Sequence, residues 1–249
     1  IDLIRREHDT DARTGKNKRD HLLDDITKVA LFLQRTGHKG HYGIDRLLAD
    51  RKYQKILTTF ARPLRHPSRH EETELGNLFA DLLQVDSSFD IMMLGSGSFR
   101  GKQLGPVVDY RSFKETYPFD NAIYMMPVKG KTFKKMCAHF LRQSVLSKGS
   151  SEYYALSSGV CVTYDFNKDV LTRCSFHGSE IQEEDILKIA LQEFHLNNCE
   201  EFLGVTNAEL SSLSAPVCVV RSDASTYEEM LQNSFESDSC IEGRTAILR

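Results

Sequence analysis

A short apolar run, Phe89 to Leu94, leads directly into a turn rich in glycine and serine, Gly95 to Gly101. So short an apolar run, bounded by a turn, predicts a strand that is buried on both faces of a sheet. Glycines let the backbone approach a ligand closely and point N–H groups toward it. Arg100, inside the turn, adds a planar, permanently charged group that suits oxyanions and stacked rings. The segment predicts a core strand ending at a ligand-binding loop, although most such loops only reverse the chain.

The remaining pattern mixes helices and strands without regular alternation. Helices are expected over Leu75–Leu83, after Asp109, over Phe133–Val145 and over Tyr227–Phe235, where Thr226 and Glu229 form a capping box. Further strands are expected at Thr58–Leu64, Ala122–Val128, Val160–Asp165, Leu171–Phe176, Ile186–Leu191, Val217–Val220 and Thr245–Leu248. Because these elements do not follow a strict βαβ order, we predict an α+β fold with mixed sheets and packed helices.

The first 52 residues differ from the rest, because they are rich in charged side chains and histidine. Apolar residues at helical spacing predict one helix, over residues 21–35, which Gly37 ends. Aspartates fall on positions 1, 3 and 12 of a calcium-loop spacing at Asp9, Asp11 and Asp20. Position 6 is not glycine and position 12 is not glutamate, so a solvated helix connection is the favoured interpretation over a calcium site. We therefore divide the chain into a polar segment, 1–52, and a domain, 53–249.

Composition excludes some classes of function. The formal net charge of −3 does not suggest a nucleic-acid binder, which usually carries a strongly basic face. No apolar run reaches 18 residues, so no membrane span is predicted. The six cysteines form no Cys-x-x-Cys pair, which favours isolated thiols over a zinc site or a disulfide framework. These features leave the cellular compartment undetermined.

Several short motifs occur in a fixed order along the chain. They are Glu72–Asp81, the loop Ser96–Arg100, Tyr117–Phe119, Val128–Lys131, Ser157–Asp165 and Glu242–Arg244. In this order they resemble the C-terminal domain of the 5'-nucleotidase family. The resemblance covers residues 53–249 and implies the substrate-binding half of a metallophosphoesterase, a hydrolase of nucleotide catabolism.

The family's catalytic half is an N-terminal metallophosphoesterase domain with two metal ions and Asp-x-His, Asn-His-Asp/Glu and Gly-His-x-His motifs. This chain contains no Asp-x-His and no Asn-His-Asp/Glu. The pairs His38/His41 and His66/His70 lack carboxylate partners and are expected to be surface or loop histidines rather than metal ligands. The resemblance thus places the divalent metal pair in an N-terminal domain that this chain lacks. We expect no metal site here and no hydrolysis by this chain alone.

The resemblance also implies a nucleoside or nucleotide ligand. Phe119 and Phe194 match the family's two stacking phenylalanines, and without the resemblance both would be interpreted as core residues. Arg100 matches an arginine near the ribose or phosphate, and Gly97 a glycine whose backbone lies against the base. Further candidates are Glu200, at the position of a ribose-binding aspartate, and Arg69, Ser96 and Ser98.

Some positions depart from the family pattern. Gly95 stands where the family has an asparagine, and Glu71 where it has an arginine, with Arg69 two residues away as a substitute. Asn198 and Cys199 replace paired glycines. Because these changes remove ligand contacts, the alternative is a non-catalytic interaction or scaffold module whose nucleotide pocket has drifted.

Overall fold

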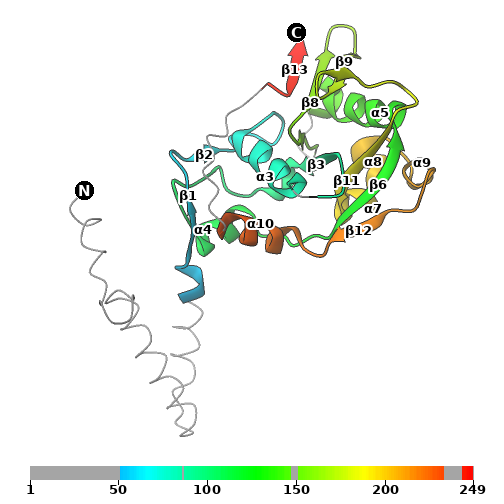
Figure 1. The fold of residues 1–249 in the computed structure, drawn as a ribbon. Helices are drawn as coiled ribbons and strands as arrows, with labels where there is room; N and C mark the ends of the chain where they lie inside the picture. The colour runs from blue at the N-terminus through cyan, green and yellow to red at the C-terminus, as the bar shows by residue number, and fades with distance from the viewer. Residues whose placement is uncertain (1–50, 86, 147–150, 233–242, 249) are drawn as a thin grey trace, which may run out of the picture. The chain divides into compact units, whose positions relative to one another are not determined.

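The computed structural model describes residues 51–85, 87–146, 151–232 and 243–248 (Figure 1). The helix predicted over 21–35, the aspartates of the calcium-loop spacing and the pair His38/His41 lie outside the described residues. A compact unit begins at Ile56. It has mixed sheets with packed helices, so the predicted α+β class is confirmed.

The larger sheet has five strands and contains the predicted buried strand. Its order is β12 (Val217–Val220), β6 (Ile123–Lys129), β11 (Ile186–Gln192), β3 (Ile91–Gly95) and β7 (Tyr154–Leu156). Among its neighbouring pairs, β3 and β11 run parallel and the others antiparallel. Every residue of β3 is buried, as an apolar run in a central strand requires.

A second sheet has the order β10 (Ser179–Glu180), β9 (Val170–Phe176), β8 (Val160–Asp165) and β13 (Thr245–Leu248). Two small pairs complete the strands: β1 (Ile56–Thr59) with β5 (Val107–Asp109), and β2 (Leu64–Arg65) with β4 (Gln103–Leu104). The turns on either side of β9 contain residues with positive φ, Asp169 and His177. Strands β8, β9, β11, β12 and β13 lie where the sequence predicts them.

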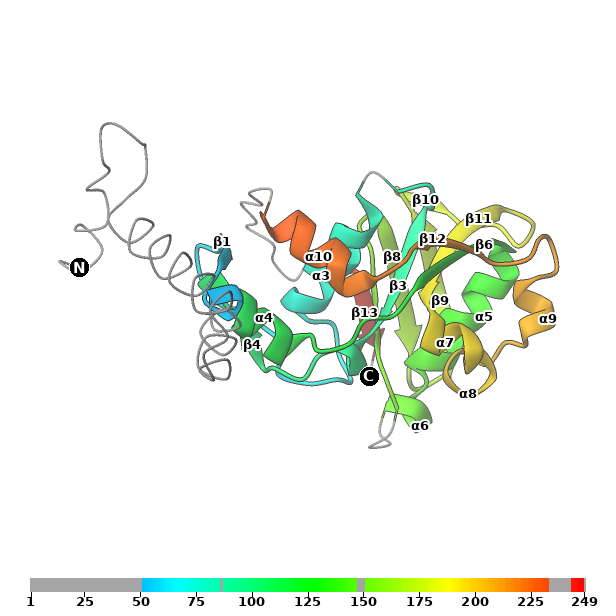
Figure 2. The same cartoon turned by 90° about the horizontal axis from the view of Figure 1, so that it is seen from below.

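Helices cover both faces of the larger sheet (Figures 1 and 2). On one side α3 (Glu74–Gln84) packs on β3 and β7, and α10 (Asp223–Gln232) packs on α3. On the other, α5 (Gly130–Leu141) contacts β6 and β11 and also β8 and β9, so it fills the space between the two sheets. The shorter helices are α4 (Tyr110–Thr116), α6 (Gln143–Leu146), α7 (Glu193–Asn197), α8 (Cys199–Leu203), α9 (Asn207–Leu210) and the 3₁₀ turn η1 (Ser96–Ser98).

Three predicted boundaries are wrong. The helix expected to reach Val145 ends at Leu141, because Arg142 takes an extended ψ of 138° before α6 begins. The last helix begins at Asp223 rather than at Tyr227, and the hydroxyl of Ser222, not Thr226, accepts an N–H of its first turn. The strand expected over 58–64 is divided into β1 and β2.

The C-terminal strand is held to α3 by a group of ion pairs and hydrogen bonds that we call the α3 clamp, made of Glu72, Asp81 and Arg244. The guanidinium of Arg244 donates to both carboxylate oxygens of Asp81, at 2.8 and 2.7 Å. The carboxylate of Glu72 accepts the backbone N–H groups of Arg244 and Thr245, at 3.2 and 3.1 Å. The clamp therefore joins the first and last of the sequence motifs, although they lie at opposite ends of the domain.

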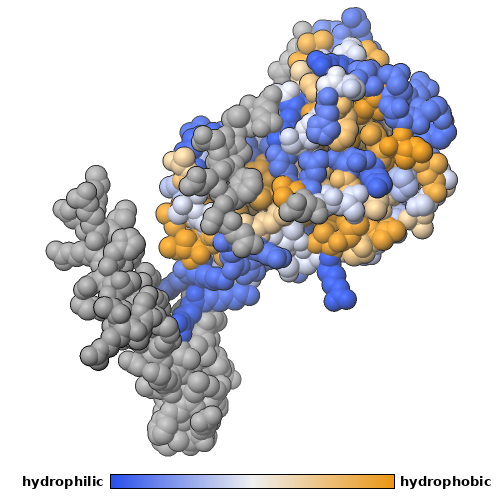
Figure 3. All heavy atoms as spheres, viewed as in Figure 1, coloured by the Kyte–Doolittle hydropathy of each residue, from blue (hydrophilic) through white to orange (hydrophobic). Residues whose placement is uncertain are grey.

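Apolar side chains also reach the surface. Figure 3 shows them interleaved with polar residues and gathered along the lower edge of the view, where β12 lies in Figure 1. β12 is an edge strand, and Val217 exposes 54% of its surface. None of the helices in the described ranges is long and apolar enough to cross a bilayer. The cysteines among the described residues are free thiols, as the sequence favours.

Candidate ligand-binding pocket

The larger sheet brings distant segments to one edge. β3 runs into η1 and β11 into α7, and because these strands are parallel neighbours their carboxyl ends lie together. β6 and β7 run in the opposite direction, so the segments that precede them, with Phe119 and Glu152, arrive at the same edge. In sheets with parallel strands this edge is the usual place for a ligand.

A pocket of about 240 Å³ lies at this edge. Five residues predicted from the sequence line it: Gly97, Ser98, Arg100, Phe119 and Phe194. The other lining residues are Asn121, Glu152, Gln192 and His195. The structure thus brings the two phenylalanines and the loop arginine to a single cavity.

Both phenylalanine rings are exposed rather than buried in the core. Phe119 exposes 38% of its surface and Phe194 49%. The guanidinium carbon of Arg100 lies 4.6 Å from the ring centroid of Phe119, which is cation–π geometry. Phe194 contacts Phe202 and His195, with ring centroids 5.6 and 5.2 Å apart. Each ring therefore keeps apolar surface available to a flat ligand.

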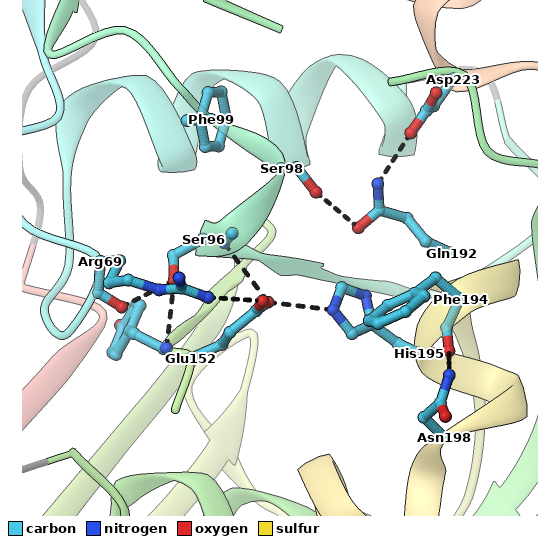
Figure 4. Close-up of polar contacts among 12 residues, drawn as sticks. Arg69, Ser96, Ser98, Phe99, Glu152, Gln192, Phe194, His195, Asn198 and Asp223 are labelled. Atoms are coloured by element: carbon cyan, nitrogen blue, oxygen red, sulfur yellow. Dashed lines mark hydrogen bonds and ion pairs between the residues drawn. The ribbon is translucent and has the colours of Figure 1, made fainter. Parts of the chain in front are cut away.

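The two serines of η1 act inside the protein (Figure 4). Ser96 donates its hydroxyl to the carbonyl oxygen of Arg69 at 2.7 Å and accepts the N–H of Tyr153 at 3.2 Å. Ser98 lines the pocket, but its hydroxyl donates to Gln192 Oε1 at 2.9 Å. The serines thus fix the loop against two neighbouring segments.

Behind Ser98 lies a buried polar network. Gln192 donates from Nε2 to Tyr117 Oη and to Asp223 Oδ2, each at 2.8 Å, and Tyr117 also donates its hydroxyl to Asp223. Burial raises the pKa of Asp223 above its usual value, and it raises the pKa of Tyr117 strongly. Asp223 also accepts the N–H of Asn121 at 2.9 Å. The network therefore positions two walls of the pocket from behind.

A second polar group is made of Arg69, Glu152 and His195, of which Glu152 and His195 line the pocket. Glu152 accepts from Arg69 Nη2 at 2.7 Å, from His195 Nε2 at 3.0 Å and from the N–H of Gly97 at 3.3 Å (Figure 4). Burial acts to raise the pKa of Glu152, but the hydrogen bond from His195 and the charge of Arg69 outweigh it, so the pKa lies below its usual value. Glu152 is accordingly a buried carboxylate in its charged form.

The sequence comparison decides the family. The profile described as "5'-nucleotidase, C-terminal domain" matches residues 54–207, more than half of the chain. The chain belongs to the 5'-nucleotidase family, and the matched region is the C-terminal domain of that family. No curated protein matches the chain in sequence.

Solved structures show the same fold at low sequence identity. The 5'-nucleotidase precursor of Thermus thermophilus aligns with a TM-score of 0.66 and 18% identity, over 84% of this chain and 42% of its own. The NAD nucleotidase of Haemophilus influenzae aligns with a TM-score of 0.66 and 12% identity, over 96% of this chain and 47% of its own. A putative 5'-nucleotidase of Staphylococcus aureus aligns with a TM-score of 0.64 and 14% identity, over 85% of this chain and 44% of its own. The chain therefore spans less than half the length of these proteins.

Three predicted site residues of the 5'-nucleotidase domain are not among the residues that line the pocket: Ser96, whose bonds are given above, Arg69 and Glu200. Arg69 reaches the pocket through Glu152, to which its guanidinium is paired. Glu200 is exposed on α8 and is not among the described residues that line the pocket. Asn198, at a departure from the 5'-nucleotidase pattern, donates from Nδ2 to the carbonyl oxygen of Phe194 at 2.7 Å. It thereby ties the end of α7 to the backbone of Phe194.

The described histidines do not form a metal site of the 5'-nucleotidase type. His66 is buried and shares a hydrogen bond of 2.9 Å with the hydroxyl of Thr73. Burial, with the charge of Lys102 next, lowers the pKa of His66 to about 4. Within the described ranges no three His, Cys, Asp or Glu side chains are grouped to hold an ion. These residues therefore do not fit the dimetal centre that the 5'-nucleotidase family implies.

The sequence interpretation missed the polar lining of the 5'-nucleotidase pocket. Gln192 and His195 were detectable, because polar residues that directly follow an apolar strand are candidates for a site. Glu152 carried no signal of this kind, since it precedes β7, a strand that the sequence did not predict. What identifies it is the pairing of β7 with β3.

Proposed function

We propose that this domain binds the nucleoside end of a nucleotide or related phosphoester. The observation that carries the proposal is that two exposed phenylalanines and one arginine, distant in sequence, line one pocket. Stacking of a base on aromatic rings contributes about 1–3 kcal/mol per base. Pockets for drug-sized ligands usually enclose about 300–1,000 Å³. A smaller pocket, of about 240 Å³, suits a ring and part of its sugar rather than a whole dinucleotide.

Each pocket residue has a distinct part in this proposal. Phe119 and Phe194 cover the faces of the base, and the backbone at Gly97 borders its edge. Arg100, exposed and lying over Phe119, supplies a permanent positive charge at the mouth, where a ribose or phosphate would extend. The buried network behind Ser98 holds these walls in place before any ligand arrives.

We further propose that the domain serves a hydrolase whose metal chemistry belongs to another domain. A dimetal centre supplies a metal-activated water and holds the phosphoryl oxygens. No described group fits that centre, so this chain's contribution is to bind and orient the substrate. The share of the matched structures that the chain spans is consistent with this division.

Calorimetric titration with adenosine and AMP tests the proposal. We expect saturable binding that Phe119→Ala and Phe194→Ala each weaken by about 1–3 kcal/mol, about fivefold to 150-fold in Kd. Phe176→Ala is the matched control, because it removes a phenyl ring from β9 in the other sheet. Absence of binding, or binding that is indifferent to both pocket variants, would contradict the proposal.

A second candidate is a non-catalytic interaction module. The ion pair between Arg69 and Glu152 favours it. This pair engages the Arg69 guanidinium, so that it is not available to an anionic ligand, and it places the Glu152 carboxylate in the pocket wall. A negative charge there opposes binding of an anionic ligand. The titration separates the two functions, because a module of this kind binds neither adenosine nor AMP.

A further inference from the structure

The side chains of His195 and Glu152 fill the space beside Gly95 that a side chain at position 95 would need. A Cβ placed on this glycine would lie 2.5 Å from Nε2 of His195 and 2.6 Å from Oε2 of Glu152, closer than real Cβ atoms come to other groups. The imidazole and the carboxylate therefore occupy the room that a larger residue at the end of β3 would take. In this way Gly95 allows a buried His–Glu pair to form part of the pocket lining.

The pair fixes which nitrogen of His195 carries a proton. A charged carboxylate can only accept hydrogen bonds, so Nε2 of His195 donates to Glu152. In the neutral imidazole, Nδ1 is then an acceptor. The side chain of His195 is only 4% exposed, and its Nδ1 has no hydrogen-bond partner among the described residues. A buried polar atom without a partner is costly, and a ligand that supplies the partner removes that cost.

Several donors of the pocket lining are already committed. The hydroxyl of Ser98 donates to Gln192, and the N–H of Gly97 donates to Glu152. The amide nitrogen of Gln192 donates to Tyr117 and Asp223. The side chain of Asn121 carries both a donor and an acceptor, so it does not discriminate between ligand donors and ligand acceptors. The guanidinium of Arg100 is a further donor, but it lies at the mouth over Phe119. What the described lining offers beyond these groups is acceptor capacity, at the carboxylate of Glu152 and at Nδ1 of His195.

We propose that the Glu152–His195 pair selects ligands whose flat ring carries an N–H donor on its edge, as an exocyclic amino group does. The inference rests on the proposed function, since it concerns the ring held between Phe119 and Phe194. It makes His195 the specificity-determining residue and Glu152 the residue that positions it. A ring without a donor on that edge leaves Nδ1 unpaired and binds more weakly.

The experiment compares two ligands that differ only in the amino group. Adenosine and purine riboside are titrated into the protein at pH 8. We expect adenosine to bind about tenfold more tightly, as one hydrogen bond to a buried acceptor implies. In His195→Leu this ratio should fall to about one, and in Glu152→Gln it should fall part of the way. Glu193→Gln, a change at an exposed neighbour on α7, should leave the ratio unchanged. A change that only weakens the fold affects both ligands alike and does not move the ratio.

A second measurement needs no variant at the pair. The ¹⁵N resonance of Nδ1 of His195 in the wild-type protein should shift with adenosine and stay in place with purine riboside. If both ligands bind equally well and depend on Phe119, the inference is wrong and the proposed function stands. If neither ligand binds, the proposed function is overturned, and this inference with it.

Discussion

The α3 clamp and the pocket contrast in how they use polar residues. In the clamp, the Arg244 guanidinium meets both oxygens of Asp81, and Glu72 accepts two backbone N–H groups. In the pocket, two aromatic rings are exposed and Nδ1 of His195 has no partner in the described structure. Sequence motifs mark both regions, so a motif alone does not separate a structural role from a binding role. The exposure of the two aromatic rings at the pocket makes that separation.

The largest predicted effect is a loss of stability when the clamp is disrupted. Asp81→Ala removes the carboxylate that accepts two hydrogen bonds from the guanidinium of Arg244, whose side chain is 4% exposed. We expect the free energy of unfolding to fall by about 3–5 kcal/mol, measured by urea denaturation. As a control, Arg62→Ala removes the more exposed ion pair with Glu74 and should cost less than about 1 kcal/mol. Equal losses in the two variants would show that the clamp is not a special contact.

A second test uses the acid stability of the clamp side of the domain. His66 bonds to Thr73, the residue that caps α3, and its pKa in the folded protein is about 4. Between the usual pKa of about 6.5 and this value the unfolded chain binds a proton that the folded chain does not. Stability is therefore fully present above pH 6.5 and is lost as the pH falls toward 4, by up to about 3 kcal/mol.

The control for this test is His66→Gln, which keeps a polar group beside Thr73 but cannot titrate. Urea denaturation across pH 7 to 4.5 should show a shallower loss of stability in this variant than in the wild type. Parallel pH profiles would mean that other groups carry the acid sensitivity.

The smallest expected effect tests whether the binding site extends beyond the lining residues. Glu200 matches a ribose-binding position in sequence but is exposed on α8, outside the lining. Glu200→Ala should therefore change the Kd for adenosine less than about twofold, a difference typical of surface changes of up to about 0.5 kcal/mol. A tenfold loss of affinity would extend the site to α8.

Much of the fold could be predicted because local signals agree with packing. The buried strand Ile91–Gly95 and the helix capped by Asp109 follow from an apolar run and from a capping side chain. Boundaries failed where a local signal competed with another: the Ser222 hydroxyl, not Thr226, lies at the start of the last helix. In the pocket, Phe119, Phe194 and Arg100 were predictable from motif order. Glu152 was not, since only tertiary pairing places it there.

Separate connections converge on one edge of the larger sheet, and this affects how substitutions can alter the ligand that the pocket binds. The residues that line the cavity come from separate connections, while backbone hydrogen bonds between the strands hold the sheet beneath them. Lining residues of one connection can change without shifting the sheet or the opposite wall. Exchanging the pocket residues Phe194 and His195 would therefore change which ligands the cavity accepts, provided that the buried Leu196, Cys199 and Leu203 of the same segment keep their place in the core.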